Sequence, residues 1–230
     1  PFIRFEQGKK LYRSTVTVEN LAFRYPGTDK DVFSKLNFII EAGQRVAIIG
    51  PNGIGKTTLM RCLAGELKPT AGRVTWVENA QPGYMPQDPQ AEFESRIDLF
   101  SWMSMWTGKA DDDQLVRATL GRLLFSGDET KKPVSVLSGG EKGRMMYGKL
   151  ILTKPNVMLM DEPTNHMDME TIESLQIGLE KYPGTLVFVS HDREFVGSLA
   201  TRVIELRPDG GINDFTGTYD EYLDAQGLES

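Results

Sequence analysis

One stretch of the chain has a spacing of glycine, lysine and threonine that can bind phosphate. Residues 50–57 read Gly-Pro-Asn-Gly-Ile-Gly-Lys-Thr and fit the pattern G-x-x-x-x-G-K-[ST] at every fixed position. Glycines let backbone N–H groups turn inward around an anion, and a helix that follows points its positive end at the same anion. Lys56 adds a charge for the β- and γ-phosphates, and the Thr57 hydroxyl is placed to ligate Mg²⁺. The stretch predicts a phosphate-binding loop; a glycine-rich turn without nucleotide is the alternative.

An acidic pair follows a continuous apolar run. Residues 157–160 are typical of a strand buried on both faces of a parallel sheet, and Asp161 and Glu162 come directly after them. Ligands of open α/β sheets gather at the carboxyl ends of strands, so we expect the pair to face the phosphate loop. Asp161 can hold Mg²⁺ directly or through water, and Glu162 can take a proton from an attacking water. An isolated Asp-Glu is usually a solvated loop, but the apolar strand favours the functional interpretation.

A histidine and a second glycine pair add two more candidates. The apolar residues 185–190 predict another central strand, which ends at His191. A lone histidine is more often structural, but at the end of a buried strand it can donate a hydrogen bond to a γ-phosphate oxygen. Residues 137–141 read Leu-Ser-Gly-Gly-Glu and precede a helical pattern. Ser138, Gly139 and Gly140 therefore predict a second anion cradle at a helix N-terminus.

Two single side chains come from segments that end near turns. Tyr25 ends a predicted strand before Pro26-Gly27, where its ring could stack on a flat base. A half-buried turn tyrosine is the alternative and, taken alone, the better one. Gln87 lies between two prolines and offers an amide at a fixed place in the chain.

Hydrophobic periodicity predicts the elements that must position these side chains. Alternating residues from Thr15 to Phe23 and the apolar runs at 36–40, 45–49, 73–77 and 84–85 indicate further strands, and 202–206 with 211–215 indicates a hairpin. Residues 58–64 predict a helix after the phosphate loop. Between 97 and 125 the period becomes helical, which predicts an inserted helical lobe with two inward faces. These faces hold Leu99, Phe100, Met103 and Trp106 on one helix, and Leu115, Val116, Thr119, Leu120, Leu123 and Leu124 on the next.

Length and composition favour one large α/β domain. The chain has 230 residues, 40% of them hydrophobic and 25% charged, and a net charge of −6 argues against nucleic-acid binding by bulk electrostatics. No apolar stretch approaches a membrane span and no signal peptide opens the chain, so we expect a cytosolic protein. Cys62, the single cysteine, falls in the helix after the loop and is expected to pack rather than react. Residues 1–14 look like a lead-in, either a solvated linker end or, less commonly, a basic and aromatic RNA contact.

The ordered set Tyr25, Gly50–Thr58, Gln87, Leu137–Glu141, 157–162, 165–168 and His191 resembles the nucleotide-binding domain of the ATP-binding-cassette family. The resemblance covers the chain from about residue 15 and implies a P-loop NTPase fold. That fold has a RecA-like core, an antiparallel β-subdomain and an inserted helical subdomain at about 90–150. It places the domain at 15–224, the end of an inter-cassette linker at 1–14 and a tail at 225–230.

The resemblance also implies roles for individual residues. Tyr25 would stack adenine, and the loop residues Gly50, Pro51, Asn52, Gly53, Ile54, Gly55, Lys56, Thr57 and Thr58 would bind the phosphates of ATP. Thr57, Gln87 and Asp161 would ligate Mg²⁺, with Glu162 as catalytic base and His191 holding the γ-phosphate. Ser138, Gly139 and Gly140 would contact the nucleotide of a second cassette, so ATP would lie between two cassettes.

Residues 137–144, 161–168, 189–195 and 215–222 are similar to the soluble ABC-F branch, whose members carry two cassettes on one polypeptide and act on the ribosome. Within this branch the chain is most similar to the second cassette of a bacterial type. Glu141 stands where membrane transporters more often have Gln, and Met167 stands where the branch usually has Leu. The alternative is the ATPase subunit of a membrane transporter, paired beneath transmembrane partners. The step of translation and the transport substrate stay open.

Overall fold

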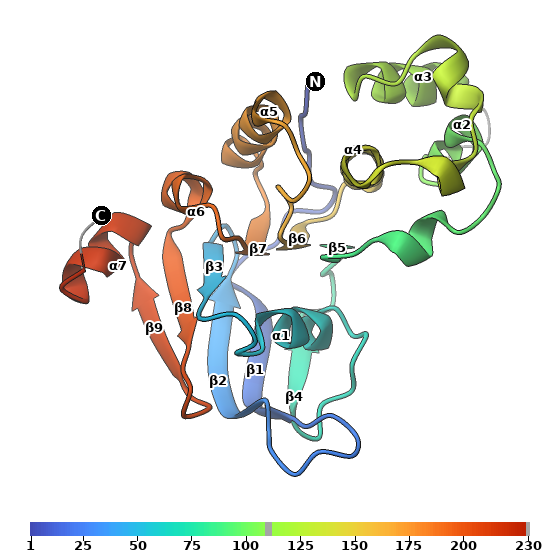
Figure 1. Cartoon of the computed structure of the whole chain (residues 1–230). Helices are drawn as coiled ribbons and strands as arrows, with labels where there is room; N and C mark the ends of the chain where they lie inside the picture. Colours follow the sequence, from blue (N-terminus) through green and yellow to red (C-terminus); the bar gives the residue numbers. More distant parts are fainter. Residues whose placement is uncertain (109–111, 229–230) are drawn as a thin grey trace.

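Two sheets organise the part of the chain that the computed structural model describes, residues 1–108 and 112–228 (Figure 1). A three-stranded antiparallel sheet has the order β2-β1-β4, and a six-stranded sheet has the order β5-β6-β7-β3-β8-β9. The smaller sheet consists of β1 (Ser14–Phe23), β2 (Phe33–Glu41) and β4 (Ala71–Trp76). The larger one consists of β3 (Arg45–Ile49), β5 (Pro82–Met85), β6 (Val157–Asp161), β7 (Thr185–Val189), β8 (Arg202–Leu206) and β9 (Ile212–Thr216).

The larger sheet is parallel except for its last strand. Strands β5, β6, β7, β3 and β8 run in one direction, and β9 returns antiparallel to β8 as the predicted hairpin. The fold class expected from the sequence, a parallel-sheet α/β domain with an antiparallel subdomain and inserted helices, is confirmed. All parallel strands therefore end at the same edge of the sheet, where the predicted site residues follow them.

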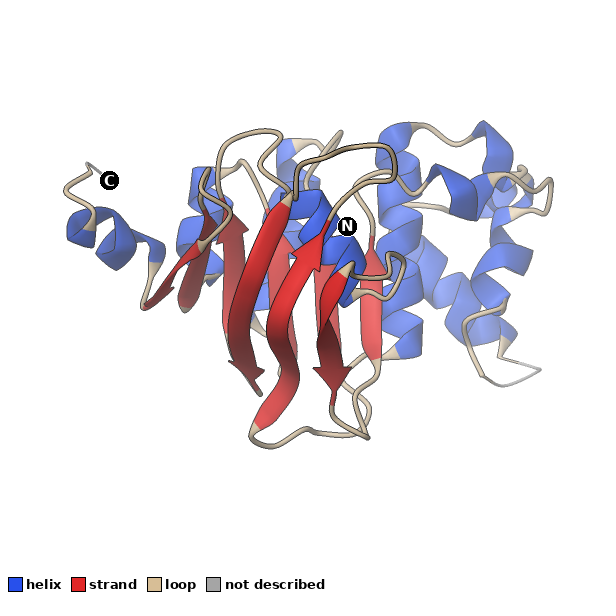
Figure 2. Cartoon of the chain, turned by 90° about the horizontal axis from the view of Figure 1, so that it is seen from below, coloured by secondary structure: helices blue, strands red, loops and turns tan. Residues whose placement is uncertain are grey.

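Helices cover both faces of the larger sheet, and Figure 2 shows the strands grouped at one end with a cluster of helices at the other. The helices are α1 (Lys56–Leu63), α2 (Leu99–Ser104), α3 (Asp113–Arg122), α4 (Gly139–Thr153), α5 (Met169–Glu180), α6 (Arg193–Leu199) and α7 (Tyr219–Ala225). Short 3₁₀ turns lie at Gln90–Phe93, Gly127–Lys131 and Val134–Val136.

The central strands are buried on both faces, as their continuous apolar sequence predicts. In β6, Met158 and Met160 join the core beneath the helical lobe, α5 and α6, whereas Val157 and Leu159 join the core between the two sheets. Helix α1 lies in that second core, because Leu59, Met60 and Leu63 pack there with residues of both sheets. The phosphate loop is thereby fixed at its strand end and at its helix end.

The helical lobe forms between residues 90 and 153, but two of its expected core residues are exposed. Leu115 is 41% exposed and Leu124 is 54% exposed, whereas Val116, Thr119 and Leu120 are buried as predicted. Helix α3 ends at Arg122, and Leu124 has a left-handed backbone with φ 68°, which turns its side chain away from the helical face. The expected lobe and tail include residues 109–111 and 229–230, which lie outside the described residues.

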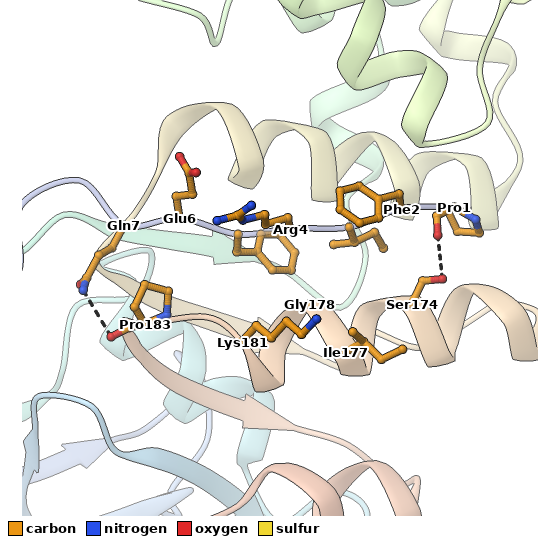
Figure 3. A pocket seen from close by; sticks show the side chains of 12 residues that line it. Pro1, Phe2, Arg4, Glu6, Gln7, Ser174, Ile177, Gly178, Lys181 and Pro183 are labelled. Carbon is orange, nitrogen blue, oxygen red and sulfur yellow. Dashed lines mark hydrogen bonds between the residues drawn. The ribbon is translucent and has the colours of Figure 1, made fainter.

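The amino-terminal segment is partly buried, whereas we expected a solvated linker end. Ile3 and Phe5 are 4% and 3% exposed and belong to the core that includes α5. The Ser174 hydroxyl of α5 donates to the Pro1 carbonyl at 2.8 Å, and the segment runs along α5 in Figure 3. On its other side the Phe2 amide donates to the Arg122 carbonyl of α3 at 2.9 Å. Periodicity is not readable in so short a segment, so its burial had no sequence signal.

A cavity of about 630 Å³ lies between this segment and α5, lined by Phe2, Ile177, Lys181 and their neighbours (Figure 3). It contains no residue of the predicted site.

Candidate nucleotide-binding site

The phosphate loop joins β3 to α1 and adopts a backbone that two of its glycines require. Gly50 has φ 148° and Gly55 has φ 122°, in the region that side chains rarely allow. A Cβ at Gly55 would lie 2.5 Å from Val32 Cγ1, and one at Gly50 would lie 3.0 Å from the Leu206 carbonyl oxygen. The loop is therefore held closely against β8 and the start of β2, and only glycine fits at these two positions.

Lys56 directs its ammonium group back across the loop. Its Nζ donates to the carbonyl oxygens of Gly50 at 2.5 Å and Pro51 at 3.2 Å. Burial lowers the pKa of Lys56, and the nearby Glu162 and Asp161 carboxylates oppose that shift. A cation thus lies inside the curve of the loop with two carboxylates facing it, which is the charge arrangement that a phosphate bound with a divalent metal would complete.

The end of β6 places the acidic pair opposite the end of β7. Asp161 pairs with Val189 in the parallel ladder, and the Glu162 amide donates to the Val189 carbonyl at 2.8 Å. Glu162 has a left-handed backbone with φ 50°, an uncommon conformation for this residue type that turns its side chain out of the strand alternation. Its carboxylate accepts from the His191 amide at 3.3 Å and contacts His191 Nδ1.

His191 links this acidic pair to the phosphate loop. Its Nε2 lies 2.6 Å from Asn52 Oδ1, so Glu162, His191 and Asn52 form a continuous chain of side chains. The three residues come from the end of β6, the end of β7 and the loop after β3. Sequence reasoning placed Asn52 in the loop but did not predict that its amide contacts His191, because the contact joins residues 139 positions apart.

The residues expected to hold Mg²⁺ fit that ion. Asp161 is fully buried, and neither of its carboxylate oxygens has a hydrogen-bond partner. Burial raises the pKa of Asp161 above its usual value, and the neighbouring Thr57 side chain opposes that shift. The Thr57 hydroxyl donates to Gln87 Oε1 at 3.2 Å, so these two oxygens are adjacent. Hydroxyl, amide and carboxylate oxygens with few carboxylates are the ligand set of Mg²⁺ in phosphate sites, where water and phosphate complete the octahedron.

Residues 1–108 and 112–228 hold no cluster of three or more His, Cys, Asp or Glu side chains that could ligate a metal. A transition-metal site of that kind is therefore not present in this part of the chain.

Tyr25 lies next to the phosphate loop. Its hydroxyl is 2.7 Å from Thr58 Oγ1, and its ring packs edge-on against Phe23 at 4.9 Å between centroids. The ring lines a hollow of about 510 Å³ together with Gly53, Ile54 and the turn at 208–210. The turn between β8 and β9 was predicted only as a hairpin connection, and no local pattern indicates that it borders this hollow.

We call Ser138, Gly139 and Gly140 the signature residues; they lie at the start of α4, apart from the phosphate loop. The Ser138 hydroxyl accepts from the Glu141 amide at 3.2 Å, and Glu141 accepts from the Ser138 amide at 3.0 Å, which forms a capping box. Gly139 and Gly140 face His166: a Cβ on Gly140 would lie 2.8 Å from the His166 carbonyl oxygen.

These residues line a hollow of about 520 Å³ that includes no residue of 50–58. The structure therefore brings Tyr25, the loop, Gln87, Asp161, Glu162 and His191 together, and keeps Ser138, Gly139 and Gly140 in a separate place.

Comparison with known proteins gives a consistent picture. Residues 33–165 match the family model described as ABC transporter. The whole chain is 56% identical over 230 residues to "Probable ATP-binding protein YbiT" of Escherichia coli O157:H7, and 94% of it is 34% identical to "Energy-dependent translational throttle protein EttA" of Escherichia coli K12. The chain spans 43% and 39% of the length of these two proteins.

A solved structure entitled "Structure of a bacterial Atm1-family ABC exporter with ATP bound" matches 97% of the chain with a TM-score of 0.77 at 22% identity, over 42% of the exporter chain. At this identity the match concerns the fold alone. No helix among the described residues is long and apolar enough to cross a bilayer. The family model covers more than half of the chain and agrees with the motifs and the fold, so the chain belongs to the ABC transporter family of ATP-binding cassettes.

Proposed function

We propose that this cassette binds ATP with Mg²⁺ at residues 50–58 and hydrolyses it to ADP and phosphate. One observation carries the proposal: Glu162 contacts His191, and His191 contacts Asn52 of the phosphate loop. A carboxylate and an imidazole thus lie at the loop, on the side where the terminal phosphate of a bound nucleotide would be attacked. A carboxylate that can accept a proton and an imidazole that can donate a hydrogen bond, both beside a phosphate loop, are the groups that attack of water on a bound phosphate needs.

Each side chain has a defined task in this reaction. Backbone amides of the loop and Lys56 bind the phosphates, and Tyr25 provides a ring for adenine in the hollow beside Gly53 and Ile54. Thr57, Gln87 and Asp161 would hold Mg²⁺, which when bound neutralises charge on the phosphate oxygens. Glu162 accepts the proton of the attacking water, and His191 donates a hydrogen bond to a γ-phosphate oxygen.

The active unit is a pair of cassettes. Ser138, Gly139 and Gly140 line a hollow that holds none of the loop residues, so they are placed to contact a nucleotide on a second cassette. The relatives YbiT and EttA are more than twice as long as this chain, as proteins with two cassettes would be. Residues 15–224 would then form one cassette, and 1–14 the end of a linker from another.

The pair of cassettes serves translation in the cytosol. This proposal is supported by the name of EttA as a translational throttle and by the similarity of the motifs to the ABC-F branch, which implies action on the ribosome. The competing proposal is an ATPase subunit of a membrane transporter; the exporter supports the fold of such a subunit, and the family model, described as ABC transporter, fits both proposals.

Two measurements test these proposals in order. The isolated chain is titrated with ATP in the presence of Mg²⁺ and again with EDTA; magnesium-dependent binding is expected, and its absence in folded protein would overturn the ATPase proposal. The full-length parent protein carrying Glu162→Gln is then sedimented with ribosomes and a non-hydrolysable ATP analogue. Enrichment over the nucleotide-free protein is expected, and equal amounts in both pellets would refute the ribosomal role.

A further inference from the structure

We propose that Asn52 is a latch for His191: it occupies Nε2 of the imidazole in the nucleotide-free cassette and gives up that nitrogen to the γ-phosphate of ATP. The inference deepens the proposed function, because it assigns Asn52 a part in distinguishing ATP from ADP. The distance of 2.6 Å between His191 Nε2 and Asn52 Oδ1 is that of a well-formed hydrogen bond.

The other ring nitrogen is also engaged. His191 Nδ1 contacts the carboxylate of Glu162, whose second oxygen accepts from the His191 amide at 3.3 Å. Glu162 is buried, whereas 58% of the His191 side chain is exposed. The imidazole is thus anchored at Nδ1 by a buried partner and reaches toward the loop with Nε2. A ring held in this way can exchange its Nε2 partner without leaving Glu162.

Asn52 is well placed to be the partner that is exchanged. It is exposed, it lies between Pro51 and Gly53 in the loop, and its side-chain contact with His191 is the one that the structure records for it. Lys56 is engaged in a comparable way, since its Nζ donates to carbonyl oxygens of the same loop. Two groups that would bind a terminal phosphate are therefore paired with atoms of the loop itself.

ATP and ADP differ in whether they compete with Asn52 for His191 Nε2. A γ-phosphate oxygen needs the Nε2 donor of His191, so ATP must break the contact with Asn52 when it binds. ADP has no γ-phosphate and leaves the contact intact. Removal of the Asn52 amide should therefore raise the affinity for ATP relative to that for ADP, and any change in the loop itself would act on both nucleotides. A partly exposed hydrogen bond is worth little, which sets the expected gain for ATP over ADP at about two- to fivefold.

The chain contains only two histidines, His166 and His191, which makes the ring itself observable. Imidazole ¹⁵N NMR of the nucleotide-free chain is compared for wild type and Asn52→Ala. The variant should shift the Nε2 resonance of His191 and leave the ring of His166 unchanged. Coincident His191 spectra would overturn the latch, whether or not the protein binds nucleotide.

Affinities for ATP and ADP, measured in Mg²⁺ with wild type, Asn52→Ala, His191→Ala and the double variant, test the exchange. The ratio of ADP to ATP dissociation constants should rise two- to fivefold in Asn52→Ala and stay constant when the same change is made in the His191→Ala background. Equal changes in both affinities would mean that Asn52 only shapes the loop and would refute the inference. Failure of wild type to bind either nucleotide would instead overturn the proposed function, and the latch contact would still be decided by the ring spectra.

Discussion

Glu162 is the residue on which the proposed hydrolysis depends most directly. Glu162→Gln keeps the shape and the acceptor for the His191 amide but cannot take a proton from water, so phosphate release should fall by about 10²- to 10⁴-fold. ATP affinity should stay within about twofold of wild type, since the loop and Lys56 are unchanged. Phosphate release and equilibrium binding measure the two effects.

Glu170→Gln is the matched control for that variant, because Glu170 is an exposed carboxylate in the first turn of α5. It should leave turnover unchanged. Wild-type turnover in Glu162→Gln would remove this carboxylate from the mechanism.

Asp161 carries a cost in stability that follows from its burial. Burial raises its pKa, so the folded protein binds this proton more tightly than the unfolded chain does. Stability is therefore lost as the pH rises from the unfolded pKa through the folded one. In EDTA at neutral pH, Asp161→Asn should stabilise the chain by about 1–3 kcal/mol, because the amide has no charge that must be removed from water.

Melting temperatures measured in EDTA and in Mg²⁺ with nucleotide check this prediction, and Asp29→Asn at an exposed site is the control. Wild type should gain stability from Mg²⁺ with nucleotide, and Asp161→Asn should not. An Asp161→Asn variant that melts at the wild-type temperature in EDTA and still responds to Mg²⁺ would exclude Asp161 as a metal ligand.

Helix α4 begins with a capping box that is tied to the preceding segment. The Lys132 ammonium bonds the Glu141 carboxylate at 2.7 Å and lowers the pKa of Glu141 to about 2, with the Ser138 amide and hydroxyl adding to the shift and burial opposing it. A depressed carboxyl pKa contributes stability above the unfolded value, and this contribution is lost as the pH falls from about 4.5 toward 2. The ion pair between Lys132 and Glu141 therefore stabilises the start of α4 at neutral pH.

Glu141→Gln tests the contribution of this ion pair, because glutamine can keep the capping box with Ser138 but has no negative charge to pair with Lys132. At pH 7 the variant should lose about 0.5–1 kcal/mol of unfolding free energy, and the difference from wild type should shrink as the pH falls below 4.5. Urea denaturation at a series of pH values measures it. A difference that stays constant with pH would show that the charge contributes nothing.

The contact between α5 and the amino-terminal segment has its own test. A Cβ on Gly178 would lie 2.8 Å from the Ile3 carbonyl oxygen, so Gly178→Ala should loosen residues 1–8 and raise their cleavage by protease. In α6, Gly197 has open space around its Cβ position, and Gly197→Ala should instead stabilise by about 0.5–1 kcal/mol through helix propensity. Equal protease sensitivity of the two variants would contradict the close packing at Gly178.

Elements with a strong local pattern could be predicted from the sequence, and contacts between distant elements could not. The apolar run at 157–160 predicted a buried strand, and the glycines and Lys56 at 50–57 predicted a phosphate loop followed by a helix. Both predictions were possible because the residues that determine each structure lie within a few positions of one another. Burial of Ile3 depends on Gly178, and the hollow beside Tyr25 depends on the turn at 208–210. Leu124 fits the helical period, but helix α3 ends at Arg122 and Leu124 is exposed; Leu115 lies in the first turn of α3 and is exposed there.

At the scale of the whole molecule, hydrolysis should require two cassettes. The phosphate loop and the signature residues line different hollows, so one chain would offer each half of the proposed shared site once. The isolated monomer should bind ATP and turn it over slowly, with a specific rate that rises with protein concentration. Fast turnover by a verified monomer at nanomolar concentration would contradict this expectation.

Mixing two inactive variants gives a sharper version of the test. Glu162→Gln removes the base of its own loop, and Ser138→Arg blocks the surface that it presents to a partner. A mixed pair contains one site with neither change, so an equal mixture should recover about one quarter of wild-type turnover. No recovery in a mixture that demonstrably pairs would refute shared sites.

The segment at residues 1–8 contacts both the helical lobe and helix α5. The Phe2 amide donates a hydrogen bond to the Arg122 carbonyl at the end of α3, in the helical lobe. Pro1 and Ile3 contact α5, the helix that follows β6 and Glu162 in the chain. A mechanical load applied at Pro1 would consequently divide between the lobe that carries the signature and the helix leading away from Glu162. A pull at this one point of the chain would therefore act on the helical lobe and on α5 at the same time.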